Sequence, residues 1–276
     1  MGTDKRDRQK ANKAARLAAQ QAAEARARRI KAVRNAVILV IAIIVVGFLL
    51  AGCGDDDDAS GTGAGSNDDV ASSGASYGTT ECPPAEGVDE PQIDFEAGFE
   101  RCIDPEKTYT ATVETTEGTV EVELDTERTP VTTNNFVALA RYGYYDGTDL
   151  FRTEAQSGII QGGSPHTQDN GDPGPGPSFS VPDEALPFTA EDYGPGTLAM
   201  ARTAAPNSAS GQFFFLANEG GRYLADPSLG ASAGSYVAFG TATEGLDVLE
   251  AIAALDDGSG TPSKQVTIES VEISES

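Results

Sequence analysis

The sequence has no tryptophan, a single histidine (His166) and only three cysteines, at positions 53, 82 and 102. A catalytic Ser-His-Asp triad needs a positioned histidine, and a zinc site needs several His or Cys ligands. His166 follows a Gly-Gly-Ser-Pro stretch and has no potential ligand partner near it, so we expect an exposed loop residue. The sequence therefore predicts neither a triad nor a metal site.

Basic residues are scarce over most of the chain. Eleven of the 19 Lys and Arg lie within residues 1–35, which hold only 3 of the 43 Asp and Glu. Residues 36–276 therefore carry 40 acidic and 8 basic side chains. Because such a region repels phosphate, nucleic-acid binding through a basic surface is excluded.

The one long uncharged run is AVILVIAIIVVGFLLAGCG, residues 36–54. In a helix this run would be about 28 Å long, close to the roughly 30 Å of a bilayer's hydrocarbon core. It has no polar face, which a buried helix of a soluble protein would normally carry. We expect a single transmembrane helix, preceded by a basic cytoplasmic arm (residues 1–35). The positive-inside rule then places everything after residue 54 outside the cytoplasm, held at the cell membrane.

A cleaved lipoprotein signal is the alternative for this segment. Leu50-Ala51-Gly52-Cys53 resembles a bacterial lipobox, in which Cys53 would be lipidated after cleavage. The 35 residues before the apolar run are many for a signal whose whole length is usually about 15–30 residues. We therefore favour an uncleaved anchor, and under either hypothesis the C-terminal part is tethered outside the cytoplasm.

Two segments lead from the apolar run to the folded region. Residues 55–80 are mostly Gly, Ser, Thr, Ala and Asp, which predicts a disordered acidic linker. Cys82 and Cys102 lie within the next segment, residues 81–106. Because disulfides form outside the cytoplasm and neither cysteine has a His or a CxxC partner nearby, we expect them to pair.

From residue 107 onward, short runs alternate apolar with polar residues, which is typical of half-buried strands. The expected strands are 109–114, 119–124, 150–152, 159–161, 197–201, 212–216, 236–240 and 265–273. Helical periodicity appears at 130–142, after Pro130 and before Gly143, and again at 245–255. The Gly- and Pro-rich segment 168–196 is expected to be mostly loop. The pattern predicts a mainly β domain, a closed barrel capped by two helices.

Nine short motifs also occur in a fixed order within residues 107–276. They are GTVEVEL (118–124), NNF (134–136), YYDGT (144–148), FR (151–152), IQGGSP (160–165), GTLAMA (196–201), PNS (206–208), GQFF (211–214) and VAFG (237–240). In this order they resemble the cyclophilin family of peptidyl-prolyl cis-trans isomerases, whose fold is an eight-stranded antiparallel barrel with two helices. The basic arm, anchor and acidic linker resemble those of membrane-anchored actinobacterial cyclophilins.

The resemblance implies an isomerase that needs no cofactor and assists the folding of exported, proline-containing polypeptides. We expect it to act as a monomer. Arg152 matches the family's catalytic arginine, which stabilises the twisted prolyl amide. The substrate-binding positions implied by the family are Met200, Phe213 and Leu224 in the proline pocket, Gln161 and Gln212 on the substrate backbone, and Ala201 and Tyr236 beside them.

Several positions depart from the family pattern. The usual histidine before Arg152 is Phe151, and the segment from Arg152 to Gln161 is one residue longer than usual. A pocket aromatic expected in that segment is replaced by Gly158 or Ile159. Further along the chain, Arg202 replaces the usual Asn, Tyr223 stands near the usual Trp or Phe, and Tyr236 replaces the usual His. These changes keep open an alternative function, a catalytically weak module or chaperone that binds proline-containing segments.

Overall fold

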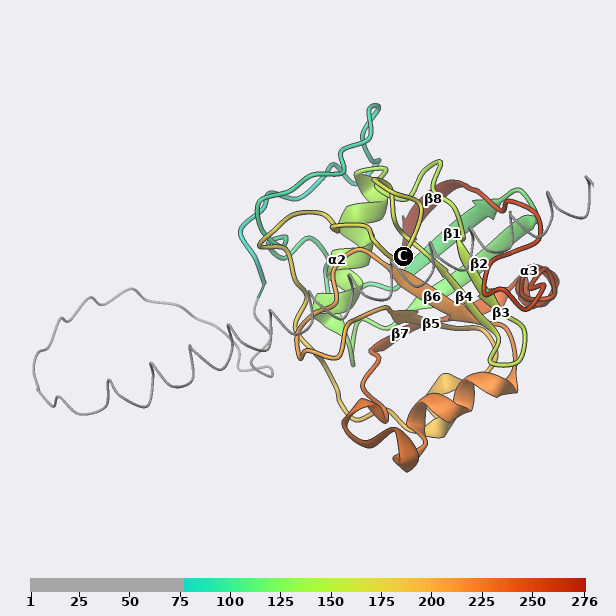
Figure 1. Ribbon diagram of the computed structural model, residues 1–276. Helices are drawn as coiled ribbons and strands as arrows, with labels where there is room; N and C mark the ends of the chain where they lie inside the picture. Colours follow the sequence, from blue (N-terminus) through green and yellow to red (C-terminus); the bar gives the residue numbers. More distant parts are fainter. Residues whose placement is uncertain (1–76) are drawn as a thin grey trace, which may run out of the picture. The chain divides into compact units, whose positions relative to one another are not determined.

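The computed structural model describes residues 77–276, which form mainly β structure with two α-helices (Figure 1). The strands are β1 (Tyr109–Thr115), β2 (Gly118–Leu124), β3 (Arg152–Glu154), β4 (Ile159–Gly162), β5 (Thr197–Met200), β6 (Phe213–Leu216), β7 (Ala238–Glu244) and β8 (Ile268–Glu275). The helices are α2 (Pro130–Arg141) and α3 (Leu246–Ala253), with three 3₁₀ turns, η1 (Ala190–Tyr193), η2 (Glu219–Ala225) and η3 (Pro227–Ser232). All eight strands and both helices expected for residues 107–276 are present, with shifts of a few residues at their ends.

The eight strands form one antiparallel sheet in the order β3-β4-β6-β5-β7-β2-β1-β8. The predicted closed barrel is wrong in one respect, because the edge strands β3 and β8 do not pair with each other. Contact is limited to residues before β3 and around the start of β8. It includes the bridge between Asp149 and Thr267, a 2.9 Å hydrogen bond from the Leu150 N–H to the Val266 carbonyl, and a 2.7 Å hydrogen bond from the Ile268 N–H to the Thr148 carbonyl. The sheet is therefore a curled half-barrel with a short seam.

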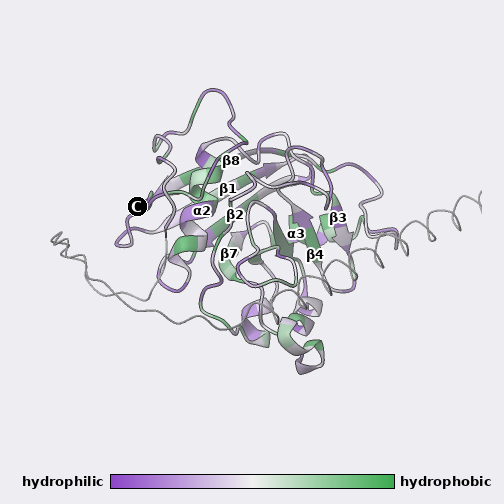
Figure 2. Ribbon diagram, turned by 60° about the vertical axis from the view of Figure 1, so that its left-hand side comes forward, coloured by the Kyte–Doolittle hydropathy of each residue, from purple (hydrophilic) through white to green (hydrophobic). Residues whose placement is uncertain are grey.

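The β1–β2 hairpin shows why alternation places the core inside this sheet. Tyr109, Ala111 and Val113 are buried, and the register pairs them with Leu124, Val122 and Val120. Because successive side chains of a strand point to opposite faces, these pairs all face inward while the intervening residues face outward. Apolar residues are correspondingly concentrated in the strands and helices, and the loops are mostly polar (Figure 2).

Helix α2 is buried along nearly its whole length, because the sheet covers one side and the segment before β1 covers another. Pro130 opens it without sacrificing a hydrogen bond, since the first N–H groups of a helix have no intrahelical partner. The carboxylate of Glu184 accepts from two of those groups, the N–H of Val131 at 3.0 Å and the N–H of Thr132 at 2.7 Å. This distant acidic cap also takes advantage of the positive end of the helix dipole.

Residues 77–106 pack against α2 as a lead-in to the sheet. Phe95 and Phe99 insert into the main core, and a disulfide joins Cys82 to Cys102 with 5.3 Å between their Cα atoms, as predicted. The side chain of Asn134 on α2 accepts from the Cys102 N–H at 2.6 Å. Residues 77–80, assigned from sequence to the linker, are bound to the lead-in, because Thr80 bridges to Phe99.

The basic arm (residues 1–35), the apolar run (36–54), Cys53 and most of the acidic linker (55–76) lie outside the described residues. Within residues 77–276, no helix combines the length and the apolar character needed to cross a bilayer.

Candidate active site

A second apolar cluster lies on the opposite face of strands β4, β5 and β6 from the main core. It is built from the residues that alternate with the inward-facing ones in these strands, together with residues of the surrounding turns. Its buried members are Ile159, Phe188, Tyr193, Ala199, Phe214, Leu216, Leu224 and Val237. An apolar cluster on this face provides a floor on which a surface site can form.

A small depression of about 160 Å³ opens on this cluster. Its walls combine apolar and hydrogen-bonding side chains: Arg152, Ile159, Gln161, Asn170, Ala201, Arg202, Phe214, Tyr223, Leu224 and Tyr236. Pockets that enclose drug-sized ligands usually measure roughly 300–1,000 Å³. The depression therefore has the size to take one ring or side chain rather than a whole small molecule.

Arg152, at the start of β3, is held on two sides. Its Nη1 donates to Oε1 of Gln161 at 2.7 Å, and its Nε donates to Oε1 of Glu154 at 3.1 Å. Its Nη2 donates to the same oxygen of Glu154 in an ion pair. A guanidinium has five N–H donors, so one N–H on Nη1 and one on Nη2 remain available to a ligand.

Gln161 connects Arg152 to the other wall of the depression. Its Nε2 donates to Oε1 of Gln212 at 2.8 Å and to Oδ1 of Asn170 at 3.0 Å. Gln161 in β4 lies directly opposite Arg152 in β3. The oxygen of the Gln161 side chain thus holds the guanidinium, and its nitrogen holds the loop that carries Asn170.

The second arginine of the depression, Arg202, has a different function. Its Nη1 donates to the carbonyl of Ser235 at 2.8 Å, its Nη2 to that of Ala205 at 2.7 Å and its Nε to that of Thr203 at 3.2 Å. These bonds join two loops at the rim. Arg202 therefore supports the wall, whereas Arg152 presents free N–H groups to it.

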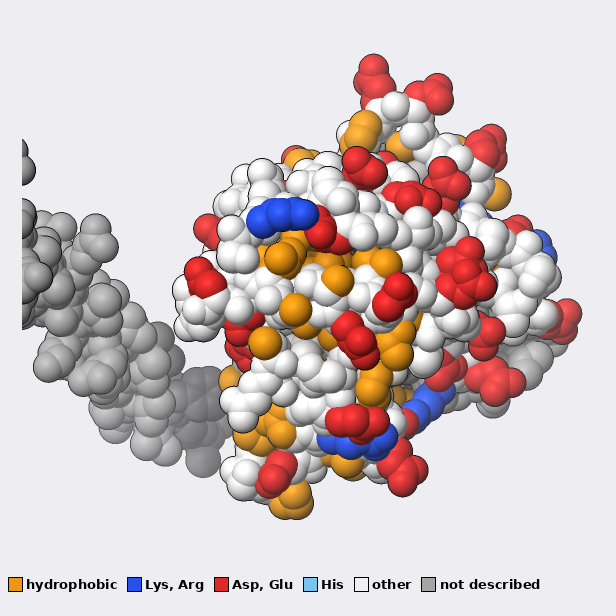
Figure 3. All heavy atoms as spheres, turned by 90° about the vertical axis from the view of Figure 1, so that its right-hand side faces the viewer, with side chains coloured by type: hydrophobic (Ala, Val, Ile, Leu, Met, Phe, Trp, Pro, Cys, Tyr) orange, Lys and Arg blue, Asp and Glu red, His pale blue; other side chains and the backbone are white. Residues whose placement is uncertain are grey.

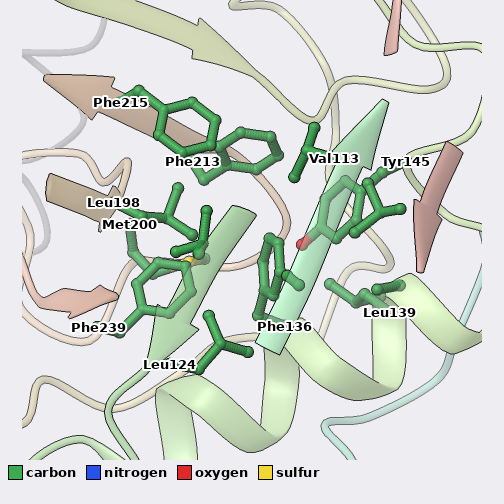
Figure 4. Close-up of a cluster of buried hydrophobic side chains, with 14 of the residues drawn as sticks. Val113, Leu124, Phe136, Leu139, Tyr145, Leu198, Met200, Phe213, Phe215 and Phe239 are labelled. Carbon is green, nitrogen blue, oxygen red and sulfur yellow. The ribbon is translucent and has the colours of Figure 1, made fainter. Parts of the chain in front are cut away.

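Met200 and Phe213, which we expected to line a pocket together with Leu224, do not line the depression. Both are almost fully buried in the main core, and the register pairs them directly across β5 and β6. Figure 4 shows them turned inward toward Phe136 and Leu124. Because side chains alternate, the following residues Ala201 and Phe214 take the outward positions.

Among the other predicted residues, Gln161, Ala201, Leu224 and Tyr236 line the depression together with Arg152. Gln212 does not line the depression, but its Oε1 accepts a hydrogen bond from Gln161. The ring of Tyr236 meets that of Phe214 edge-to-face, with centroids 5.5 Å apart.

The segment from Arg152 to Gln161, which we expected to be one residue longer than in the family, contains a turn directly before β4. Gly158 lies in that turn with a φ of +71°, and a Cβ there would approach the Asn218 nitrogen to 2.7 Å. Position 158 is thus restricted to glycine, and Ile159 lines the depression.

Three site residues were missed from the sequence: Phe214, Glu154 and Asn170. Strand alternation predicts Phe214 on the outer face of β6, since its neighbours Phe213 and Phe215 face the main core. Glu154 and Asn170 lie in no motif, and only the folded arrangement brings them to Arg152 and Gln161.

His166 is half-buried and partnered, contrary to the expectation of an exposed loop residue. Its Nδ1 lies 3.2 Å from Oδ1 of Asp172, and its Nε2 lies 3.2 Å from Oδ1 of Asp94 in the lead-in. Burial lowers the pKa of His166, but the two carboxylates outweigh it and hold the pKa above its usual value. In residues 77–276 no group of three or more His, Cys, Asp and Glu is arranged to hold a metal ion.

A larger groove of about 760 Å³ lies between the start of β1, the turn after β2 and η1. Its arginine, Arg128, is engaged in an ion pair with Asp192 at 2.6 Å and stacks over Phe188. It contains none of the residues predicted for the site.

Comparisons with known proteins point to one family. Residues 110–273 match the family model described as "Cyclophilin type peptidyl-prolyl cis-trans isomerase/CLD". Over 171 residues the chain is 34% identical to the peptidyl-prolyl cis-trans isomerase cyp18 of Streptomyces antibioticus, covering 59% of this chain and 98% of that protein.

A second relative is a probable peptidyl-prolyl cis-trans isomerase B of Mycobacterium tuberculosis. It is 34% identical over 172 residues, which are 57% of this chain and 52% of that protein. Among solved structures, a cyclophilin type isomerase of Cryptosporidium parvum is 27% identical, with a TM-score of 0.49, over 60% of this chain and 98% of the other.

Proposed function

The chain belongs to the cyclophilin-type peptidyl-prolyl cis-trans isomerases, and we propose that it isomerises Xaa-Pro bonds of exported polypeptides with Arg152 stabilising the twisted amide. The substrate is a proline-containing peptide segment.

The reaction requires neither a nucleophile nor a cofactor. Resonance gives the peptide bond a rotational barrier of about 18–20 kcal/mol, and the trans preference before proline is only about 0.5–1 kcal/mol. When the amide twists, resonance is lost and the prolyl nitrogen gains lone-pair character. A donor that bonds this nitrogen only in the twisted state lowers the barrier without stabilising the ground state.

The free N–H groups of Arg152 beside the apolar floor are the observation that carries the proposal. The prolyl ring would occupy the 160 Å³ depression against Phe214, Leu224 and Ile159. Gln161 and Glu154 hold the guanidinium, so little conformational entropy is lost when it binds the amide.

Exchange NMR of an Xaa-Pro peptide tests the proposal with the full-length chain in mild detergent. The matched variants are Arg152→Ala and Arg101→Ala, since Arg101 is an exposed arginine of the lead-in, away from the depression. We expect wild type and Arg101→Ala to accelerate cis/trans exchange equally and Arg152→Ala to lose most of the acceleration. Equal rates for all three proteins would refute the role of Arg152.

We further propose that residues 36–54 anchor the enzyme as an uncleaved single span, with residues 77–276 outside the cytoplasm. The charge asymmetry around the run and the Cys82–Cys102 disulfide support this location. Mass spectrometry of the membrane-bound protein is the test. A chain that retains residues 1–52 is expected, whereas an acylated N-terminal Cys53 would establish the lipoprotein alternative.

A second candidate function is a binding module that holds proline segments with little turnover. The ion pair between Arg152 and Glu154 favours it, because a carboxylate beside the guanidinium reduces the positive potential offered to the substrate. In the same NMR experiment this function would appear as peptide shift changes without faster exchange.

A further inference from the structure

A second hollow adjoins the proposed proline pocket. It measures about 480 Å³ and is lined by Glu154, Gln156, Ser157, Gly220 and Tyr223. Tyr223 also lines the proline pocket, so the two hollows share this residue. A substrate whose proline occupies the first hollow would have a neighbouring side chain within reach of the second.

Glu154 is the only charged residue that lines this second hollow. Its Oε1 accepts twice from Arg152, and its Oε2 accepts from the Ser157 hydroxyl at 2.9 Å. A carboxylate offers about four acceptor positions, two on each oxygen. One position on Oε2 therefore remains for a donor from a ligand, and it can be filled without breaking the contact to Arg152.

The other large side chain of the hollow, Tyr223, is suited to the same kind of ligand. Tyr223 is 43% exposed, an unusually open position for a large aromatic ring in this domain. Burial raises the pKa of its hydroxyl, and the charge of Glu154 raises it further while that of Arg152 lowers it. The face of an aromatic ring attracts cations, and a carboxylate adds a hydrogen-bonded ion pair.

We propose that Glu154 and Tyr223 form a cation subsite, which binds a Lys or Arg side chain of the substrate close to the isomerised proline. This inference rests on the proposed isomerase function and adds to it a preference for basic proline segments. An acidic side chain would be repelled by Glu154, and a neutral one would leave the acceptor position on Oε2 unfilled. On the face of the domain shown in Figure 3, acidic side chains are widespread with few basic ones among them.

The test is a peptide series with the full-length chain. Each peptide carries one Xaa-Pro pair and a single Lys, norleucine or Glu. That residue stands at one of the two positions before the pair or at one of the two positions after it. Exchange NMR gives kcat/KM for each peptide, and a titration followed by chemical shifts gives its Kd. The readout is the Lys-to-norleucine ratio, which is independent of any general change in activity caused by a variant.

We expect Lys to raise kcat/KM about three- to tenfold over norleucine at one position at least, because exposed ion pairs and exposed cation–π contacts are each weak. Glu154→Gln should bring the ratio close to one, and Tyr223→Leu should reduce it. Glu191→Gln, which removes an exposed charge in the larger groove, should leave the ratio unchanged and thereby exclude an effect of net charge.

Two results would overturn the inference: a ratio close to one at every position in wild type, or a Lys preference that persists in Glu154→Gln. Failure of the proposed function is a separate outcome, in which no peptide exchanges faster. In that case the Kd ratio of Lys to norleucine peptides still decides whether the cation subsite exists.

Discussion

The neighbouring residues Phe213 and Phe214 are expected to separate stability from activity. The ring of Phe213 packs in the main core against Phe136, Tyr145 and Phe215, with centroids 5.7, 5.2 and 5.7 Å away. The ring of Phe214 has one aromatic partner, Tyr236, and lines the depression. Substitution of each by leucine keeps an apolar side chain and removes the aromatic contacts.

An aromatic pair contributes about 0.5–1.5 kcal/mol beyond the burial of its area. Phe213→Leu, with three such pairs, should therefore lower the free energy of unfolding by about 2–4 kcal/mol. Phe214→Leu, with one pair, should lower it by about 1 kcal/mol. The loss of pocket surface in Phe214→Leu should reduce kcat/KM roughly tenfold, since tenfold corresponds to about 1.4 kcal/mol of binding.

Urea denaturation gives the two stabilities, and exchange NMR at a temperature where both variants are folded gives the activities. Phe213→Leu should be the less stable variant, and Phe214→Leu should be the less active one. Equal loss of stability with equal loss of activity would refute the assignment of the two rings to opposite faces of β6.

Three further predictions concern contacts outside the pocket floor. Replacing both Cys82 and Cys102 by serine should lower the free energy of unfolding by about 3 kcal/mol, given the sequence separation of 20; a loss under about 0.5 kcal/mol would mean that other contacts hold the lead-in. The pKa of His166 is raised in the folded protein. Its protonated form therefore stabilises the fold fully below the unfolded-state pKa of 6.5, and this stabilisation is lost as the pH rises through the raised pKa. His166→Gln should thus be more destabilising at about pH 5.5 than at about pH 8 by urea titration, and equal effects at both would contradict the ion pairs. Arg202→Lys cannot reach the carbonyls of both Ser235 and Ala205, and should lower the unfolding midpoint by an amount equivalent to about 2 kcal/mol; an unchanged midpoint would show that these bonds do not hold the rim.

Local patterns in the sequence were enough to predict most of the fold. The β1–β2 hairpin follows from alternation around Gly118, and α2 follows from Pro130, its apolar periodicity and Gly143. The seam between Asp149 and Thr267 was beyond such patterns, because it depends on how far the whole sheet curls.

The site was predicted less completely, for two different reasons. Family motifs place Met200 and Phe213 in the pocket, whereas strand alternation assigns their neighbours Ala201 and Phe214 to the outer face. Glu154, by contrast, has no sequence signal as a site residue. It touches Arg152 only because both lie at alternate positions of the short strand β3 and therefore share one face.

The isomerisation rate of an Xaa-Pro peptide with wild type, Arg152→Ala and Arg152→Lys tests the central claim most directly. Lysine retains the charge but cannot both contact Gln161 and donate from a planar fork to the twisted amide. Loss of a donor that acts on the transition state typically costs about 100-fold or more in kcat. Both variants should therefore lose about 100-fold in kcat with little change in the Kd of the peptide. A kcat close to that of wild type in Arg152→Lys, or in Arg152→Ala, would contradict the account.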